Sequence, residues 1–249
     1  MKINKGDIFK IGNHVIGYGD SLDKEFVSKA IGKAKVKIIL CDPPYGVAYV
    51  ENKKGFAKLS SDSEKIIAND HIQTEAEYEE FNRKYLDAVI PYLTDYNAYY
   101  IFNADPMYPS LRSALKKSGF YYGQMLIWIK NQPVMSRKDY LSMYELIAYG
   151  WFGKHKMERS KSKNVIYYPR PQRSKLHPTQ KPIGLLRKII PDNTKVGDVV
   201  YDPFLGSGST ALACEHMARK CIGIEIDEQY VLVTIKRLEK LINTKAIKI

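Results

Sequence analysis

Two short strings most constrain what this chain can fold into. The string DPPY at 42–45 follows the apolar run 36–41, and the string DPFLGSGST at 202–210 follows the apolar run 199–201. Both runs predict buried strands. Each string therefore puts a carboxylate and a stiff or glycine-rich loop at the carboxyl end of a strand, which is the edge where open α/β sheets bind ligands. We expect one site with two halves, one for a nucleoside cofactor and one for a flat base that bears an amine.

The order of the remaining elements predicts a single α/β domain over 1–249. Segments typical of strands and helices alternate at both ends of the chain, as in sheets whose parallel strands are joined by helical crossovers. Two polar or basic stretches, 51–73 and 130–175, are expected as insertions that contact target DNA. The expected elements are a hairpin over 8–18, strands over 36–41, 98–102, 123–130, 141–151, 199–202 and 221–226, and helices after a cap at Thr74 and over 109–117, 210–219 and 228–241.

The positive charge of the chain is concentrated in one stretch. The net charge is +12, and residues 154–175 contain eight Lys or Arg and a single acid. Such a cluster favours a polyanionic partner, because Lys and Arg neutralise phosphates. We interpret the stretch as an arm that contacts DNA, with a solvated basic loop as the alternative. The candidate contacts are Lys161, Lys163, Tyr167, Arg170 and Arg173.

Composition also limits the compartment and the metals. No apolar run approaches the ~18 residues needed to span a membrane, and the N-terminal segment 1–10 has no apolar signal region. The three cysteines, Cys41, Cys214 and Cys221, are odd in number and lack the spacing of metal ligands. We expect reduced thiols in a cytoplasmic protein with no membrane contact and no metal site.

The glycine loop is the cofactor half of the expected site. Its core, GSGSTA at 206–211, precedes a helix, so backbone N–H groups and the positive end of the helix dipole face a ligand. The string also fits G-x-G-x-x-G/A, which keeps a nicotinamide dinucleotide as an alternative. Asp202 would repel a pyrophosphate but attract the ammonium of a methionine moiety, which favours S-adenosylmethionine. Glu225 ends the next strand, where an acid grips ribose hydroxyls.

The DPPY string is the target half. Each proline fixes φ, so the turn is preformed. The Asp42 carboxylate and the Pro43 carbonyl can accept both hydrogens of an exocyclic amine while Tyr45 stacks on the base. Accepting both turns the nitrogen toward tetrahedral geometry, and the bonds strengthen as positive charge develops in the transition state. We therefore expect Asp42, Pro43, Pro44 and Tyr45 to be catalytic, acting on a base swung out of duplex DNA.

Together the motifs resemble those of the DNA amino-methyltransferases of the permuted beta class, in which the target motif precedes the cofactor motif. The resemblance spans nearly the whole chain, and the ordered combination of blocks is highly specific. The blocks are GDS at 19–21, DPPY at 42–45, YELI at 144–147, HPTQKP at 177–182, and DPFLGSGST at 202–210 followed by GIEID at 223–227.

The resemblance implies a Rossmann-like methyltransferase fold with a seven-stranded, mostly parallel sheet and one antiparallel strand. It also implies S-adenosylmethionine as the methyl donor. The implied cofactor-binding residues are Asp202, Phe204, Gly206, Gly208 and Ser209 around the methionine and sulfonium portion, Glu225 at the ribose, Asp20 at the adenine, and Thr179 and Lys181 near the methionine end.

Asp rather than Ser at position 42 resembles the adenine-N6 subgroup, so the resemblance implies methylation of adenine N6 in double-stranded DNA. Methylation of cytosine N4 or of RNA bases is the alternative within the class. Two alternatives come from other classes, namely an NAD-dependent oxidoreductase and a nucleic-acid-binding protein without catalysis. The helix expected over 228–241 is also a candidate surface for a homodimer.

Overall fold

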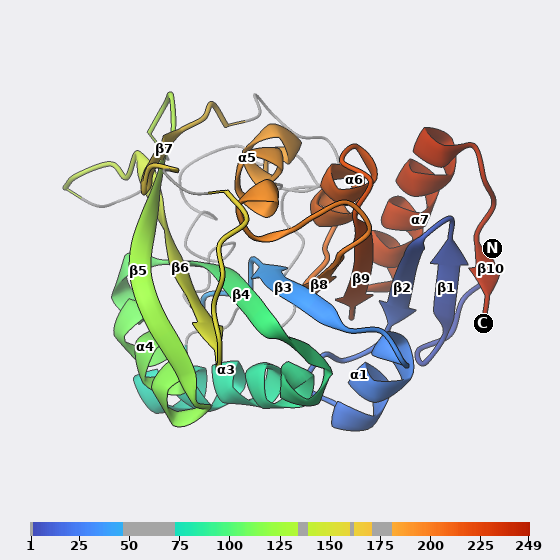
Figure 1. Ribbon diagram of the computed structural model, residues 1–249, viewed down its shortest axis with the longest axis horizontal. Coiled ribbons are helices and arrows are strands. Elements are labelled where there is room, and N and C mark those ends of the chain that lie inside the picture. Colours follow the sequence, from blue (N-terminus) through green and yellow to red (C-terminus); the bar gives the residue numbers. More distant parts are fainter. Residues whose placement is uncertain (1, 47–72, 134–138, 160–161, 171–180) are drawn as a thin grey trace.

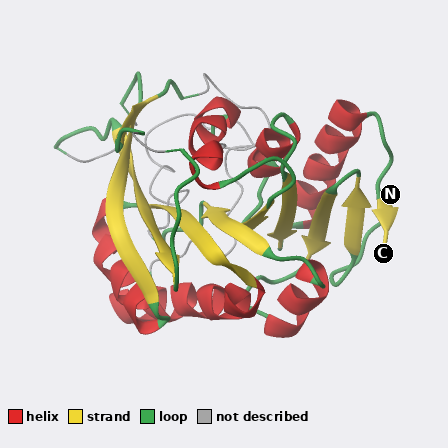
Figure 2. Cartoon of the chain, in the orientation of Figure 1, coloured by secondary structure: helices red, strands yellow, loops and turns green. Residues whose placement is uncertain are grey.

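The computed structural model describes residues 2–46, 73–133, 139–159, 162–170 and 181–249. One sheet runs through these residues, with helices on both of its faces (Figure 1, Figure 2). The strands are β1 (Ile8–Ile11), β2 (His14–Tyr18), β3 (Val36–Cys41), β4 (Leu93–Asn103), β5 (Phe120–Ile129), β6 (Tyr144–Phe152), β7 (Val165–Tyr167), β8 (Val199–Asp202), β9 (Lys220–Glu225) and β10 (Ile247–Lys248). The helices are α1 (Lys24–Ile31), α3 (Glu75–Val89), α4 (Tyr108–Lys117), α5 (Ile183–Asn193), α6 (Ser209–Glu215) and α7 (Glu228–Ile242).

The centre of the sheet has the arrangement expected from the sequence. In the part of the chain that the structure describes, the strand order is β10-β1-β2-β9-β8-β3-β4-β6-β5-β7. The five strands β2, β9, β8, β3 and β4 are parallel to one another, and β6 is antiparallel between β4 and β5. Those seven strands form a mostly parallel sheet with one antiparallel strand, so the predicted fold class is confirmed. β1 and β10 extend one edge, and β7 extends the other.

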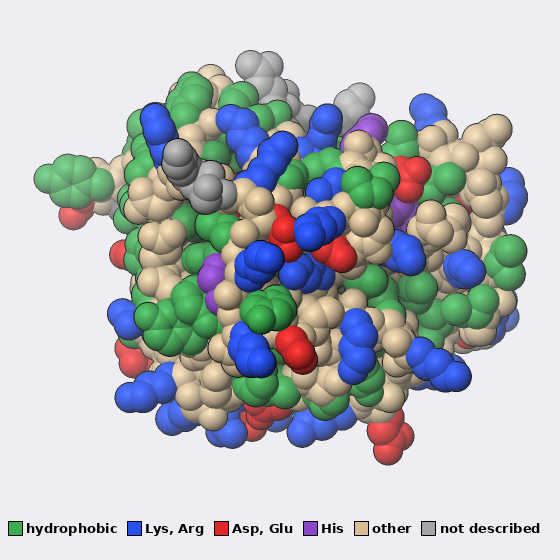
Figure 3. Space-filling view, in the orientation of Figure 1, with side chains coloured by type: hydrophobic (Ala, Val, Ile, Leu, Met, Phe, Trp, Pro, Cys, Tyr) green, Lys and Arg blue, Asp and Glu red, His purple; other side chains and the backbone are tan. Residues whose placement is uncertain are grey.

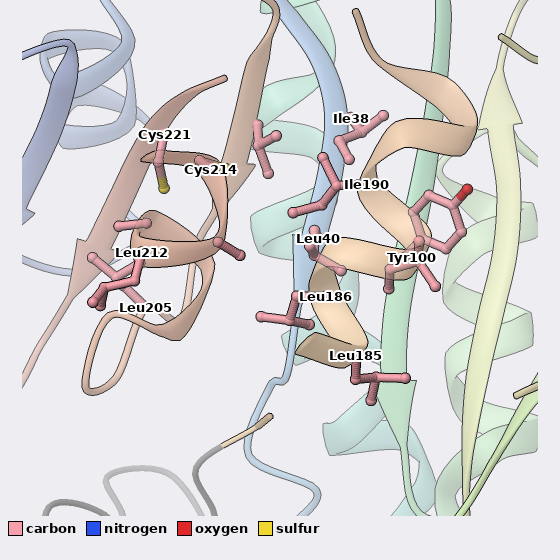
Figure 4. Close-up of a cluster of buried hydrophobic side chains, with 14 of the residues drawn as sticks. Ile38, Leu40, Tyr100, Leu185, Leu186, Ile190, Leu205, Leu212, Cys214 and Cys221 are labelled. Atoms are coloured by element: carbon pink, nitrogen blue, oxygen red, sulfur yellow. The ribbon is translucent and has the colours of Figure 1, made fainter. Parts of the chain in front are cut away.

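Alternate residues of the central strand β3 enter two separate hydrophobic cores. Ile38 and Leu40 belong to the core beneath α5, α6 and α7, whereas Ile39 and Cys41 belong to the core beneath α1, α3 and α4. This is the period-two alternation of a strand covered on both faces. Figure 4 shows the first pair beside the leucine side chains of α5. Because β3 is packed from both sides, the turn that follows it starts from a rigid support.

Parallel pairing brings the ends of distant strands to one edge of the sheet. β3 lies directly beside β8, with Ile39 opposite Tyr201. β2 lies beside β9, with Tyr18 opposite Glu225. The DPPY turn and the glycine loop therefore leave the sheet side by side, although their aspartates are 160 positions apart in the sequence. Neighbouring parallel strands end at the same edge, which makes a shared site geometrically available.

The helices begin where the local sequence indicates. The Thr74 hydroxyl accepts the backbone N–H of Glu77 at 3.3 Å, and the Glu77 carboxylate accepts the backbone N–H of Thr74 at 2.8 Å. This reciprocal pair is the capping box that the sequence predicts for α3. None of the described helices is long and apolar enough to cross a lipid bilayer.

One helix end differs from the sequence expectations, and the two expected insertions are described only in part. Within 130–175, the strand expected over 141–151 is present as β6, and β7 follows it; both pair with β5. The helix expected over 210–219 ends at Glu215, because Ala218 has a φ of 53° and the backbone N–H of Arg219 returns to the Cys214 carbonyl at 2.9 Å. The other expected insertion, 51–73, lies outside the described residues except for its last position.

Candidate active site

Four carboxylates form a row along the carboxyl edge of the sheet. They follow the strand order β2, β9, β8, β3: Asp20 lies two residues after β2, Glu225 ends β9, Asp202 ends β8 and Asp42 directly follows β3. Asp202 is 3% exposed and Glu225 is 9% exposed. Buried carboxylates are costly unless hydrogen-bond donors or cations compensate them, so such a row indicates a ligand site.

Asp202 is a buried acid that titrates near neutrality. Its Oδ1 accepts the backbone N–H of Phe204 at 3.0 Å, and the Thr210 hydroxyl donates a second hydrogen bond. Burial raises the pKa of Asp202 to about 7, although both hydrogen bonds act in the opposite direction. A cationic group that binds beside Asp202 would offset the lost hydration and favour the ionised carboxylate.

Glu225 ties the end of β9 to the glycine loop. Its Oε2 accepts the backbone N–H of Gly206 at 2.7 Å, and its Oε1 accepts that of Asp227 at 2.8 Å. Burial raises the pKa of Glu225 to about 7. Each carboxylate oxygen has a further lone pair, so Glu225 can accept hydroxyl donors as well.

The glycine loop is fastened to α7. Gly208 has a φ of +85°, and a Cβ atom there would lie 2.7 Å from the Thr234 side chain. The Thr234 hydroxyl donates to the Gly206 carbonyl at 2.9 Å, and the Arg237 guanidinium donates to the Ser207 carbonyl. Glycine is therefore required at position 208 for both its backbone conformation and its small size. The loop is held in one shape before Ser209 begins α6.

Two other expected cofactor residues lie close to this loop. The Asp20 carboxylate accepts the backbone N–H of Leu22 at 2.9 Å, and the preceding Gly19 N–H donates to the Glu225 carbonyl at 2.9 Å. Phe204 is half-buried, with its ring centroid 5.5 Å and 5.0 Å from those of Phe81 and Tyr85 on α3. Thr179, the remaining expected contact besides Lys181, lies outside the described residues.

The DPPY turn presents a carboxylate whose two oxygens are both engaged. The Tyr45 hydroxyl donates to Asp42 Oδ1, and the Lys181 ammonium contacts Oδ2. Burial raises the pKa of Asp42, and the positive charge of Lys181 counteracts only part of that shift. Pro43 is buried, whereas Pro44 and Tyr45 are half-buried. The carboxylate is thus held by Tyr45 from the turn itself and by Lys181 from a distant part of the sequence.

Lys181 lies at the target half of the site. Its ammonium pairs with Asp42 and is 3.1 Å from Glu145 Oε2, and Glu145 Oε1 in turn is 2.6 Å from Lys130 Nζ. Sequence reasoning expected Lys181 near the methionine end of a cofactor and gave Glu145 and Lys130 no role. The signal for them was weak, namely a charged residue beside the apolar runs LIAY and LIWI.

The basic stretch lies at the outer edge of the sheet. Lys163 is exposed and Tyr167 is 62% exposed, next to or within the edge strand β7. Arg170 is half-buried, and its backbone N–H donates to the Asn131 side chain at 3.1 Å. Figure 3 shows Lys and Arg side chains distributed over the face of the molecule that Figure 1 also views. Lys161 and Arg173 lie outside the described residues.

Metal binding has no candidate in the part of the chain that is described. No group of three or more His, Cys, Asp or Glu side chains there could hold a metal ion. Cys41, Cys214 and Cys221 are buried free thiols.

The mixed sheet, the glycine loop and the acidic row define a Rossmann-like methyltransferase fold. The sequence profile of a family described as DNA methylase matches residues 36–236. This match covers well over half of the chain. The chain therefore belongs to the DNA methylase family, and its substrate is DNA.

Two solved structures share the fold over most of the chain. The M1.HpyAVI–SAM complex superposes with a TM-score of 0.67 at 26% identity, covering 90% of this chain and 98% of that one. The PvuII DNA methyltransferase, described as cytosine-N4-specific, has a TM-score of 0.70 at 18% identity, covering 94% of this chain and 92% of that one. At 18% identity the likeness concerns the fold alone.

One curated relative is similar to a shorter segment of the chain, with higher identity. The DNA adenine methyltransferase YhdJ of Escherichia coli (strain K12) is 46% identical over 63 residues, which is 25% of this chain and 21% of that protein.

Proposed function

We propose that this protein transfers the methyl group of S-adenosylmethionine to N6 of adenine in DNA. The observation that carries the proposal is the pairing of β3 with β8, which lets Asp42 and Asp202 follow neighbouring strands at one edge. A donor beside Asp202 and an amine beside Asp42 then face each other. Direct transfer needs no covalent intermediate, so buried Cys41 has no role in it.

The donor half suits the chemistry of S-adenosylmethionine. Its cationic ammonium and sulfonium suit the buried Asp202, whereas a pyrophosphate would be repelled there. Its ribose hydroxyls suit Glu225, and its adenine suits Asp20. When bound, S-adenosylmethionine supplies an electrophilic methyl group. The further proposed contacts are Phe204, Gly206, Gly208 and Ser209 in the loop, with Thr179 near the methionine end, whereas Lys181, which the sequence analysis expected there, pairs with Asp42.

The target half positions and activates the amine. The Asp42 carboxylate and the Pro43 carbonyl accept its two hydrogens, Pro44 keeps the turn rigid, and Tyr45 stacks on the base. The nitrogen lone pair bonds to the methyl carbon as the carbon–sulfur bond breaks, and the electron pair of that bond stays on sulfur. The nitrogen then loses one proton, which Asp42 can accept and pass to water. Hydrogen bonds to the developing cation are stronger than those to the neutral amine.

Two observations support adenine as the target base. Position 42 is Asp rather than Ser, and the curated relative that is 46% identical over 63 residues is described as an adenine methyltransferase. The likeness to the cytosine-N4-specific enzyme is a likeness of fold. Duplex DNA hides the amine, so the base must be extruded, and Lys163, Tyr167 and Arg170 are proposed to hold the DNA, together with Lys161 and Arg173.

The test is transfer of labelled methyl from S-adenosylmethionine to DNA that lacks base methylation, followed by nucleoside analysis. Wild type should yield N6-methyladenine. Asp42→Ala should yield none while it still binds S-adenosylmethionine, because the donor half is intact. Asp95→Ala, which removes an exposed aspartate, is the matched control and should retain activity. Label on cytosine would move the assignment to N4-cytosine, and absence of any transfer by wild type would reject catalysis.

A thermal-shift comparison separates the proposal from an oxidoreductase. S-adenosylmethionine and its demethylated product should raise the melting temperature, because a ligand that binds only the folded state stabilises it. NAD should not. Stabilisation by NAD alone would contradict the assignment of the donor half.

A further inference from the structure

Four charged side chains form a mostly buried chain of charges that extends from the target half into the sheet, in which the lysines are buried and the Asp42 and Glu145 side chains are 23% and 20% exposed. Their order is Asp42, Lys181, Glu145, Lys130, so negative and positive groups alternate. They come from the ends of β3 and β5, from β6, and from the position two residues before the start of α5. Lys130 is 5% exposed and Lys181 is 8% exposed. The four side chains together carry no net charge, which limits the free-energy cost of burying them.

Lys181 occupies the oxygen that a target amine needs. Tyr45 already donates to Asp42 Oδ1, so the ammonium on Oδ2 fills the other half of the carboxylate. The Lys181 ammonium is chemically a substitute for the amine, since both are nitrogen donors. A base whose amine takes the position of this ammonium on Oδ2 displaces Lys181 from Asp42.

Glu145 offers the displaced ammonium a second acceptor. Its Oε1 is held by Lys130 at 2.6 Å, while its Oε2 is buried, 3.1 Å from Lys181 Nζ, and lacks a hydrogen bond of good geometry. A small movement of Lys181 would complete that bond. The move exchanges one carboxylate partner for another and leaves the net charge of the buried chain unchanged.

We propose that Glu145 is a positioning residue that receives the Lys181 ammonium when the target amine takes its place on Asp42. The inference rests on the proposed function and applies to any exocyclic amine. No proton moves in this exchange. The contact between Lys181 and Asp42 breaks, and two hydrogen bonds form, one between the amine and Asp42 and one between Lys181 and Glu145. Lys130 keeps the Glu145 carboxylate oriented in both states.

The charges of Lys181 and Glu145 shift the pKa of Asp42 in opposite directions, so their removal should change the pH dependence of methyl transfer in opposite directions. Besides Lys181 and Glu145, Asp42 faces Tyr45 and Cys41 on its own segment, Asp202 at the end of β8 and Tyr78 on α3. Lys181 lowers the pKa of Asp42 and Glu145 raises it. Removal of the Lys181 charge should therefore move the acidic limb of methyl transfer to higher pH, and removal of the Glu145 charge should move it to lower pH.

The experiment measures methyl transfer to unmethylated DNA at saturating S-adenosylmethionine across pH, for wild type, Lys181→Gln and Glu145→Gln. Saturation restricts the profile to groups that titrate in the donor complex. We expect the two limbs to shift in opposite directions. The plateau rate of Glu145→Gln should fall by about tenfold, the scale of one charged hydrogen bond, with Glu145→Asp restoring part of it.

Controls separate this exchange from a general structural effect. Glu79→Gln removes the carboxylate of an exposed ion pair between α3 and α4, 2.5 Å from Lys117 Nζ, and it should shift neither limb nor plateau. Either site variant that folds and binds S-adenosylmethionine suffices as a test. A limb that stays in place or moves in the opposite sense overturns the proposal, whereas absence of transfer by wild type itself would overturn the proposed function instead.

Discussion

At the residue scale, we expect Asp202 to make the proposed binding of the methyl donor depend on pH. Its raised pKa of about 7 means that the carboxyl is partly protonated near neutrality, and only the ionised form attracts a cation. We expect the affinity for S-adenosylmethionine to increase between about pH 6 and pH 8. Calorimetric titration of Asp202→Asn should show weaker binding and a smaller pH dependence, with the remainder due to Glu225, whose pKa is also about 7. Equal pH dependence in wild type and variant would contradict this role of Asp202.

A substitution at Gly208 can test how tightly α7 holds the glycine loop. Alanine at 208 would adopt an unfavourable φ and would also collide with Thr234. Gly197 has the same φ of +85° but open space around it, so Gly197→Ala isolates the backbone term of about 1–2 kcal/mol. Gly208→Ala should lower the free energy of unfolding by more than this control and should weaken donor binding. Urea unfolding of both variants measures the difference, and equal losses would show that the loop can move away from α7.

At the scale of elements, His14 joins β2, β9 and α6. Its Nδ1 accepts the backbone N–H of Cys221 at 3.0 Å, so its Nε2 carries the proton and donates to Glu215 at 2.8 Å. Burial lowers the pKa of His14 below 6.5, and Glu215 only partly opposes this. The unfolded chain therefore takes up a proton first as the pH falls.

Acidification below about pH 6.5 should consequently destabilise the protein through His14. His14→Gln should be less stable at pH 7, by about 1–3 kcal/mol for the altered buried hydrogen bonds. Its free energy of unfolding should nevertheless decrease less than that of wild type on acidification. Urea unfolding of wild type and His14→Gln, at pH 7 and at a pH below about 6.5, measures both decreases. Parallel decreases would show that His14 does not contribute to the acid sensitivity.

Elements with local signals could be predicted from the sequence, and elements that depend on pairing could not. The capping box at Thr74 and the hairpin of β1 and β2 depend on residues a few positions apart, and the structure has both. β7 is three residues long and β10 is two. Such short strands are defined by the neighbour they pair with, which no local pattern reveals.

The site follows the same division. Asp42, Asp202 and Glu225 could be located because each ends an apolar strand and adjoins a recognisable loop. The link from Lys130 through Glu145 to Lys181 exists only because β6 lies between β4 and β5. A sequence read segment by segment does not contain that strand order, so the buried charge chain required the structure.

At the scale of the whole molecule, we expect the basic stretch to contribute to DNA affinity. Each phosphate contact that is lost should reduce the slope of log affinity against log salt by about 0.9. The double variant Lys163→Ala, Arg170→Ala should therefore bind DNA more weakly and with a flatter slope. The control is Lys24→Ala, on the helix α1, which covers the hydrophobic core that it shares with α3 and α4. A slope unchanged by the double variant would mark the stretch as a solvated loop.

The pairing of β2 with β9 and of β3 with β8 also has a consequence for how the protein acquires its activity. Strands from the first fifth of the chain hydrogen-bond to strands from its last fifth. Contacts between such remote segments carry a large loop-closure entropy and slow the folding of a chain. The candidate site is thus completed only when the two ends of the chain have met, so during refolding the recovery of ligand affinity should trail the return of helical circular dichroism.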